Sequence, residues 1–495
     1  MTIPVLSIVL FLPLAGALLV SLVPKDYVKL MRLVALASSI VAFGASLWML
    51  FLFNSADGGF QLVEKVEWIS RYRASYHLGV DGISLWLVLL TTFLVPLCIA
   101  ASWRVDKKVK ALNVILLLME TSILGVFLSL DLLLFYIFWE GMLIPMYFLI
   151  GVWGYERRVY AALKFFLYTL FGSLLMLVGV AALYFLGGRT FDLAELSRSG
   201  LGPSAQLWLF GAFFASFAIK VPIFPFHTWL PDAHTEAPTA GSVLLAGVLL
   251  KMGGYGFLRL SIPLFPDATV KFAPWLAILG VIGIVYGGIV SIVQSDVKRL
   301  VAYSSVSHLG FVVLGIAALN TAATTGSVLQ MVSHGLSTGL LFLLIGMLYQ
   351  RAHTRKIADL SGVGGVMPVF GGMFLIAVLS SLGLPGLNGF VGEFLILNGT
   401  FPVMRALTII ATLGVVLAAI YLLWMYERVF TGPVKIPHAE RKSVWRDVSP
   451  GELAVIVPVI AMMLWIGLYP KPFLDRIEPS VERVLSNLNR PVASR

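Results

Sequence analysis

Charged residues are scarce in this chain of 495 residues. Only 12% are Asp, Glu, Lys or Arg, whereas 59% are hydrophobic, and the mean hydropathy is +0.94. A soluble domain carries about 25% charged residues. A compact soluble core cannot enclose so much apolar surface, and the excess would lie exposed to water. The scarcity of charge therefore excludes a soluble protein and predicts an integral membrane protein.

Other features are also missing. The single cysteine, Cys98, excludes an intrachain disulfide and any zinc or iron–sulfur site built on cysteine. No nicotinamide or flavin fingerprint occurs, so we expect no cofactor and no metal in this chain. The net charge of +10 is spread over short clusters instead of forming one patch, which argues against a nucleic-acid partner. The start, MTIP, lacks a basic region before the first apolar run, so we expect no cleaved signal peptide.

Long apolar runs are what the chain has in abundance. A membrane-spanning helix needs about 20 mostly apolar residues, and about fourteen such segments occur. The predicted spans are 4–23, 30–53, 81–102, 111–130, 132–153, 160–187, 206–229, 238–260, 273–294, 300–319, 325–350, 366–400, 404–430 and 451–470. The sequence thus predicts an all-α polytopic membrane protein.

Lysine and arginine concentrate in alternate loops, namely those after spans one, three, five, nine, eleven and thirteen. The positive-inside rule places these loops in the cytoplasm. With an even number of spans, both termini are expected on the outer side, which in a bacterium is the periplasmic side of the inner membrane. The segment 472–490 has helical spacing of apolar residues and is predicted to be an amphipathic helix on the outer surface. The loop 54–80 is predicted to be ordered.

Several ionisable residues lie where a membrane protein should have none. A charge at the centre of a spanning helix costs roughly 2.5–3.5 kcal/mol on insertion scales. The four deepest are Glu140, Lys220, Lys251 and Glu393. Further candidates inside or near the spans are His308, His334, Lys164 and His227. Such residues persist where they are paired, face an aqueous cavity or carry out chemistry.

Residue type favours proton transfer over static pairing. A relay needs groups that exist both protonated and deprotonated near neutral pH, which buried lysine, glutamate and histidine can do. Arginine stays charged, and none of the four deepest residues is arginine. Simpler alternatives remain open: Glu140 and Lys220 could be a static ion pair, each histidine could bond a backbone carbonyl, and Lys164 could extend to the interface.

Two spans contain residues that break helices close to a buried charge. Pro222 and Pro225 follow Lys220, and the run SSLGLPGLNG at 380–389 precedes Glu393. Irregular backbone at membrane depth is tolerated only inside protein or beside a water-filled cavity. Broken helices at corresponding places of two halves indicate a transport site.

Spacing between the halves predicts an internal repeat. Five spans map onto the next five, and because five is odd the second unit would be inverted in the membrane. We therefore divide the chain into three N-terminal helices (1–107), a first repeat (108–262), a second inverted repeat (270–431) and a last helix with the amphipathic tail (432–495).

Several motifs carry a family resemblance over nearly the whole chain. The runs FWEGMLIPMYFLIGVWG, FAIKVPIFPFHTWLPDAHTEAPTAGSVLLAGVLLKMGGYGFLR, SVSHLGFVVLG, QMVSHGLSTGLLFLLIGMLY and LPGLNGFVGEF closely resemble the antiporter-like subunits of respiratory complex I, the proton-translocating NADH–quinone oxidoreductase. The resemblance implies fourteen helices, two inverted five-helix repeats with one broken helix each, and a central polar axis. By motif, the residues on that axis are Glu140, Lys220, Lys251, His308, His334 and Glu393.

The resemblance also implies a function and partners. A chain of this kind pumps protons as part of the NADH:quinone oxidoreductase of the respiratory chain, with flavin, iron–sulfur clusters and quinone in other subunits. Its partners would be the other complex I membrane subunits, above all the two sibling antiporter-like subunits, together with lipids. Alternatives with the same fold are a subunit of a sodium/proton antiporter or of an energy-converting hydrogenase; a structural scaffold is a third. Sibling subunits and Mrp-type antiporters typically carry lysine where this chain has Glu393, which argues against the antiporter and indicates one particular type of complex I subunit.

Overall fold

A computed structural model describes residues 3–437 and 445–489, and helices make up most of this part of the chain. Within it, twelve helical segments are long and apolar enough to cross a membrane. Ten are α1 (Val5–Leu22), α2 (Val28–Leu52), α3 (Gly82–Ala101), α4 (Val109–Leu128), α7 (Arg158–Leu186), α14 (Pro266–Ile292), α15 (Val297–Ala317), α16 (Thr321–Ala352), α20 (Arg405–Phe430) and α21 (Pro450–Leu468). The other two are composite: α5 (Leu132–Gly141) with α6 (Leu143–Trp153), and the segment Thr239–Leu264.

Two further crossings are interrupted, and both interruptions lie where the sequence predicts them. One consists of α9 (Pro203–Lys220) and α10 (Trp229–Glu236), and the other of α18 (Pro368–Ser381) and α19 (Asn388–Thr400). Together with the twelve segments above, they give the fourteen crossings expected from the sequence. Lys220 is the last residue of α9, and Glu393 lies in the second half of the other pair.

The segment Thr239–Leu264 is irregular and fully enclosed by other helices. It runs through α11 (Thr239–Leu244), a π-helical stretch η2 (Leu245–Leu249), α12 (Leu250–Gly256), a second π-helical stretch η3 (Phe257–Ser261) and α13 (Ile262–Leu264). Short π-helical insertions occur mostly at functional sites, because they redirect side chains and backbone carbonyls. Lys251 lies in α12, between the two.

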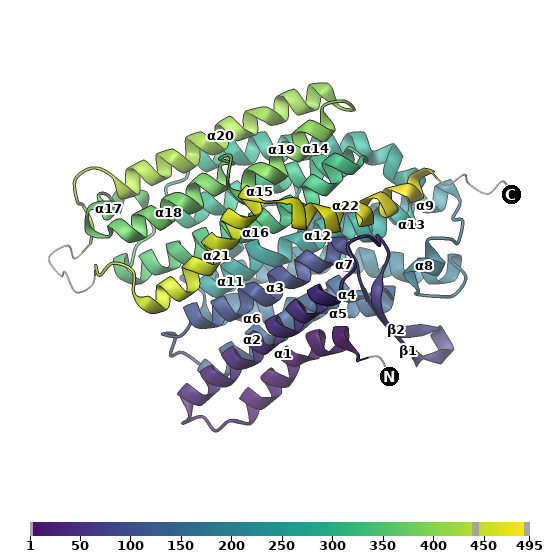
Figure 1. The fold of residues 1–495 in the computed structure, drawn as a ribbon, viewed down its shortest axis with the longest axis horizontal. Helices are drawn as coiled ribbons and strands as arrows, with labels where there is room; N and C mark the ends of the chain where they lie inside the picture. The colour runs from purple at the N-terminus through teal and green to yellow at the C-terminus, as the bar shows by residue number, and fades with distance from the viewer. Residues whose placement is uncertain (1–2, 438–444, 490–495) are drawn as a thin grey trace.

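The loop 54–80, predicted to be ordered, folds as a hairpin and is an exception to the helical pattern. Strand β1 (Gln61–Ile69) pairs antiparallel with β2 (Ala74–Val80) through the turn η1 (Ser70–Tyr72). The hairpin lies beside α8 (Leu193–Leu196), and Figure 1 shows both at the end of the molecule where α1 begins. The remaining short elements are η4 (Ile357–Asp359), α17 (Val363–Val366) and η5 (Ser486–Asn489).

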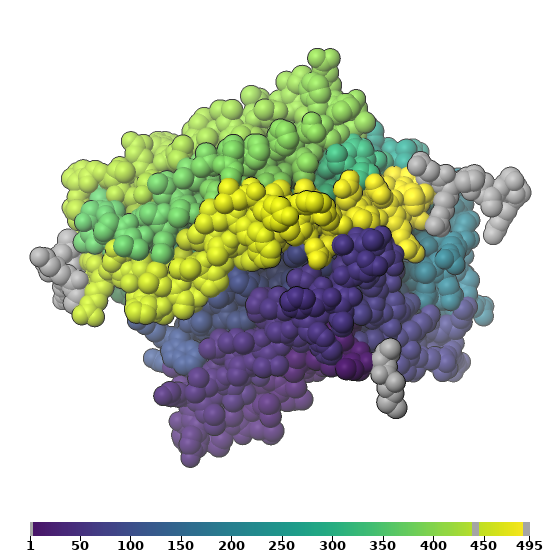
Figure 2. All heavy atoms as spheres, viewed as in Figure 1, coloured from purple at the N-terminus to yellow at the C-terminus, as the bar shows by residue number. Residues whose placement is uncertain are grey.

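The predicted amphipathic tail is the helix α22 (Lys471–Leu485), which buries Phe473, Ile477 and Val481. It packs on α16 and α3, where the rings of Trp86 and Phe473 lie 4.3 Å apart between centroids. Figure 2 shows α21 and α22 as one continuous band across the visible face of the molecule. The band holds the helices beneath it together from outside.

The spanning helices differ in how much of their surface is covered. Figure 1 shows α1 and α2 along one edge, α20 along the opposite edge and α15, α16 and α12 between them. The apolar windows of α16 and of Thr239–Leu264 are entirely buried, whereas only about a third of the α20 window is. Apolar side chains such as Leu413 and Ile420 are exposed on the uncovered face of α20. The buried charges of the sequence sit on the enclosed helices.

Candidate proton-transfer site

Lys251 is completely buried and has two partners. Its Nζ donates a hydrogen bond to the backbone carbonyl of Ala246, in the π-helical stretch η2, and lies 2.8 Å from Nδ1 of His334 on α16. The sequence offered no acidic partner for this lysine, and within the described residues its side-chain partner is a histidine. A lysine that contacts an imidazole nitrogen can pass a proton to it directly.

Glu393 and His308 form a second contact. Nδ1 of His308 on α15 lies 2.8 Å from Oε1 of Glu393 on α19, and both side chains are buried. Nε2 of Gln330 donates to the same glutamate oxygen at 2.9 Å, and the hydroxyl of Tyr421 lies 3.1 Å from Nε2 of His308. Gln330 and Tyr421 are neutral, and they orient Glu393 and His308 respectively.

The two contacts are adjacent, because the rings of His308 and His334 lie 5.9 Å apart between centroids. The result is a row of four titratable side chains in the order Lys251, His334, His308, Glu393. They come from α12, α16, α15 and α19, which are far apart in the sequence. Four of the six residues predicted for the site are therefore brought together.

Glu140 and Lys220 form a separate group around the interruption between α5 and α6. The Nζ of Lys220 lies 3.5 Å from Sδ of Met142 and 5.1 Å from the ring centroid of Trp139. Oε1 of Glu140 is enclosed but has no hydrogen-bond partner in the described part of the chain. None of the ion pairs within 4.0 Å in that part joins the two residues, so the structure holds them as neighbours and not as a closed pair.

The two secondary candidates lie near the first broken helix. Lys164 on α7 does not simply extend to the interface, since its Nζ pairs with Oδ2 of Asp232 on α10 at 2.6 Å. His227 is buried in the break between α9 and α10, with its ring 5.1 Å from that of Tyr286 between centroids. Its Nδ1 has no hydrogen-bond partner within the residues described.

Sequence reasoning missed several buried ionisable groups, among them Lys298, His234 and Glu120. Lys298 counted as a loop residue, yet it is buried with its Nζ on the carbonyl of Ala237. His234 is fully buried, stacked on the ring of Phe342 at 4.7 Å between centroids. Glu120 is fully buried on α4, and neither carboxylate oxygen has a partner among the described residues. Glu120 lies at the centre of the predicted span 111–130, and its depth there is the same signal that identified the other buried charges.

Comparison with known proteins gives the same assignment as the motifs. Residues 129–420 match the family model described as "NADH:quinone oxidoreductase/Mrp antiporter, TM". The chain is 46% identical to NADH-quinone oxidoreductase subunit M of Rhodobacter capsulatus, over 97% of this chain and 96% of the relative. It is 43% identical to NADH-ubiquinone oxidoreductase chain 4 of Arabidopsis thaliana, with 97% of each chain covered. Subunit M is the type that Glu393 indicates.

Solved structures agree on the fold. A chain of respiratory complex I from Thermus thermophilus superimposes with a TM-score of 0.89 at 31% identity, covering 98% of this chain and 100% of that one. A chain of the Mrp complex from Dietzia superimposes with a TM-score of 0.87 at 20% identity, covering 98% of each, which shows the shared fold. The chain therefore belongs to the family of membrane subunits of NADH:quinone oxidoreductases and Mrp antiporters.

Proposed function

We propose that this chain is a proton-translocating membrane subunit of a respiratory NADH–quinone oxidoreductase, and that the row Lys251–His334–His308–Glu393 is its proton path. The row itself is the observation that supports the proposal most. It joins four titratable side chains in the enclosed centre of the molecule, where unpaired charge is costly. A scaffold would gain nothing from a contiguous row of this kind.

Each step of the path moves one proton between named atoms. The ammonium of Lys251 gives a proton to Nδ1 of His334, and the lysine becomes a neutral amine. His334 then releases a proton from Nε2, which reaches His308 by ring rotation or through one water molecule, because the rings are 5.9 Å apart. His308 passes a proton from Nδ1 to Oε1 of Glu393. After these steps Lys251 is a neutral amine that can take up a new proton. Each histidine must return to its starting tautomer, and Glu393 must release its proton, before the next proton can follow.

Glu140 and Lys220 are proposed to act as the gate of this path. With the carboxylate close, Lys220 retains its proton, and with the carboxylate withdrawn, burial favours release. The present separation corresponds to the withdrawn arrangement, in which a thioether and an indole ring surround the lysine. A movement at the α5–α6 interruption would therefore change proton affinity at Lys220 without moving the rest of the bundle.

The remaining proposals concern the assembly. The chain would contribute no redox centre of its own. Flavin, iron–sulfur clusters and quinone would be held by other subunits, and the sibling antiporter-like subunits and lipids would be its neighbours. The basic loops would face the cytoplasm, which places the hairpin, α22 and both termini on the outer side of the cell inner membrane. The two units 108–262 and 270–431 would be inverted repeats, each with one interrupted helix.

The test is NADH-driven proton uptake by inverted membrane vesicles that carry Glu393→Gln. Glutamine keeps the size of the side chain and its hydrogen bonding but cannot carry the proton. We expect proton uptake per NADH oxidised to fall by at least about tenfold, while a native gel shows the complex assembled.

The matched control is Glu478→Gln, an exposed glutamate on α22. It should pump normally. Normal pumping by Glu393→Gln would remove Glu393 from the path. Transport that requires sodium in the native protein would support the antiporter instead.

A further inference from the structure

A cavity of about 140 Å³ lies at the end of the molecule that carries the hairpin, away from the proton path. Its walls come from the segment leading into β1, the residue before α3, α8 with the loop after it, the segment from η3 to α13, and α22 with η5. The residues that line it and bear on its chemistry are Phe60, Asp81, Arg198, Arg259, Arg483 and Asn487. None of them has a role in the proposed function.

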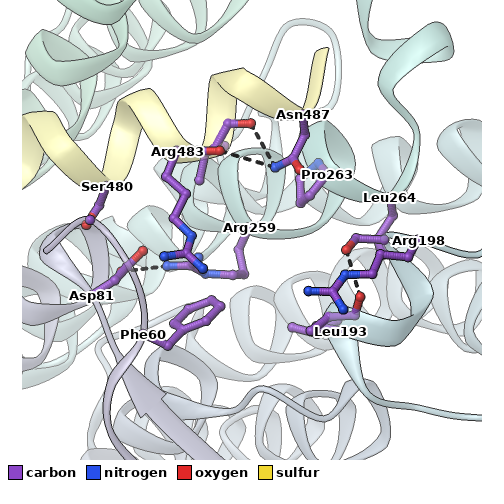
Figure 3. Close-up of a pocket in the computed structure, with 14 residues that line it drawn as sticks. Phe60, Asp81, Leu193, Arg198, Arg259, Pro263, Leu264, Ser480, Arg483 and Asn487 are labelled. Carbon is purple, nitrogen blue, oxygen red and sulfur yellow. Dashed lines mark hydrogen bonds and ion pairs between the residues drawn. The ribbon is translucent and has the colours of Figure 1, made fainter. Parts of the chain in front are cut away.

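Three arginines line this cavity. Figure 3 shows Arg483 descending from α22 toward Arg259, which points at Asp81, and Arg198 on the other side of the cavity. Positive charges that line one cavity repel one another, and a bound anion would offset that repulsion. A carboxylate in the lining, Asp81, offers only partial compensation.

The carboxylate of Asp81 already has ion-pair and hydrogen-bond partners. Its Oδ1 lies 2.6 Å from Nη2 of Arg259 and also accepts hydrogen bonds from the backbone of Ile83 and Ser84 at the start of α3. Arg259 is itself fixed, since it is buried, donates from Nε to the hydroxyl of Tyr255 at 3.2 Å and lies over a phenyl ring. The wall nearest the interior is therefore rigid, and the charge of Arg259 there is balanced by Asp81.

The other two arginines lack close partners among the described residues. Nη1 of Arg483 reaches Oδ1 of Asp57 only at 4.0 Å, and no ion pair of Arg198 occurs in that part of the chain. Arginine binds phosphate oxygens through two parallel N–H groups, and such charge-assisted bonds are about twice as strong as neutral ones. Two uncommitted guanidinium groups facing a fixed third one are suited to a tetrahedral phosphate.

The depth of the cavity indicates where such a phosphate would come from. The cavity lies where α13 ends, beside α22 and close to the segment that leads into the hairpin. It is therefore at the end of the spanning segment Thr239–Leu264, the level where hydrocarbon gives way to headgroups. We propose that this cavity binds a phosphate-bearing anion, the headgroup phosphate of an anionic phospholipid or a free phosphate ion, through Arg198, Arg259 and Arg483.

Binding is measured by calorimetry on the full-length chain in uncharged detergent, with dioctanoyl phosphatidylglycerol and inorganic phosphate as separate probes. The test variant is Arg198→Gln/Arg483→Gln, which leaves the Arg259–Asp81 pair intact. We expect its dissociation constant for the bound probe to rise at least about tenfold. The matched control, Arg71→Gln, removes an exposed arginine of the turn η1 that does not line the cavity, and should bind as the native chain does.

The outcomes separate the two sources and can refute the site. Binding of phosphatidylglycerol that phosphate does not displace identifies a lipid headgroup, and binding of phosphate alone identifies an aqueous anion. A thermal unfolding midpoint equal to that of the native chain shows that the double variant is folded, and Arg198→Lys/Arg483→Lys should recover part of the affinity. Failure of the native chain to bind either probe, or equal binding by the double variant, would overturn the proposal.

Discussion

At the scale of single residues, a substitution of Lys251 can distinguish proton transfer from a purely electrostatic role. Arginine in its place keeps the positive charge but does not release a proton at any working pH. We therefore expect Lys251→Arg to lower NADH-driven proton uptake by at least about tenfold. The comparison is Lys271→Arg, at an exposed position of α14, which should pump normally. Full activity of Lys251→Arg would mean that charge alone matters there.

Substitution of Glu140 tests whether Glu140 and Lys220 form the gate of the proton path. Removing its carboxylate in Glu140→Ala leaves Lys220 beside Met142 and the rings of Trp139 and Phe165, so no nearby carboxylate favours the charged form of the buried lysine. Proton uptake in inverted vesicles should fall strongly while the complex stays assembled on a native gel. Glu140→Asp retains the charge and should be milder. If Glu140→Ala pumped normally, the pair would be structural.

Sequence reasoning found the charged residues of the site but not their pairing. Lys251 and Glu393 were identified by their depth within apolar runs, because a charge at that depth is costly unless it is paired, hydrated or functional. The contact of Lys251 with His334 could not be found in this way, since it depends on the packing of α12 against α16. Lys298 was missed for a related reason: it follows a span, and only the tertiary fold buries it.

At the scale of elements, the interrupted helix α18–α19 depends on a close backbone contact. A Cβ on Gly389, in the first turn of α19, would lie 2.1 Å from the carbonyl oxygen of Ser380, so the two halves could not keep their present approach. Gly389→Ala should cost about 1–3 kcal/mol of stability and displace the helix that carries Glu393. Both thermal unfolding and proton uptake should therefore be impaired.

Gly372→Ala is the control for that change, because Gly372 lies in α18 with open space around its Cβ position. It should leave stability unchanged or slightly raised, since alanine favours a helix. Equal effects of the two substitutions would show that the close approach at Gly389 does not matter.

Proline and glycine made the two interruptions predictable, because their effect on a helix is local. The π-helical stretches on either side of α12 could not be predicted. The residues Leu245–Leu249 have an ordinary helical composition, and the extra residue in the turn is accommodated by the surrounding helices. The hairpin β1–β2 was expected only as an ordered loop, since it lies between two apolar spans of a chain that is otherwise predicted to be helical.

At the scale of the whole molecule, a polar cluster ties the hairpin to the helical bundle. Asp192, which caps α8, accepts a hydrogen bond from Lys65 of β1 at 2.7 Å and lies 3.0 Å from Nδ1 of His77 of β2. Oδ2 of Asp131, which caps α5, accepts from the backbone N–H of Ser75 at 2.9 Å. Burial alone would raise the pKa of Asp192, but the hydrogen bonds from His77 and Lys65 outweigh it and hold the pKa well below its usual range.

The lowered pKa of Asp192 sets the sign of a pH effect on the stability of the whole chain. A carboxyl whose pKa is lower in the folded than in the unfolded protein stabilises the fold above its unfolded pKa of about 3.9, and loses that contribution as the pH falls through the lower folded value. Asp192→Asn should cost about 2 kcal/mol near neutral pH, and its difference from the native chain should persist down to about pH 4 and shrink only below that. Thermal unfolding of the purified protein from pH 7 to pH 3 measures this, with Asp475→Asn, an exposed partner of Lys471, as the control that should change little. A difference that is constant down to pH 3 would show that the charge of Asp192 does not hold the hairpin to the bundle.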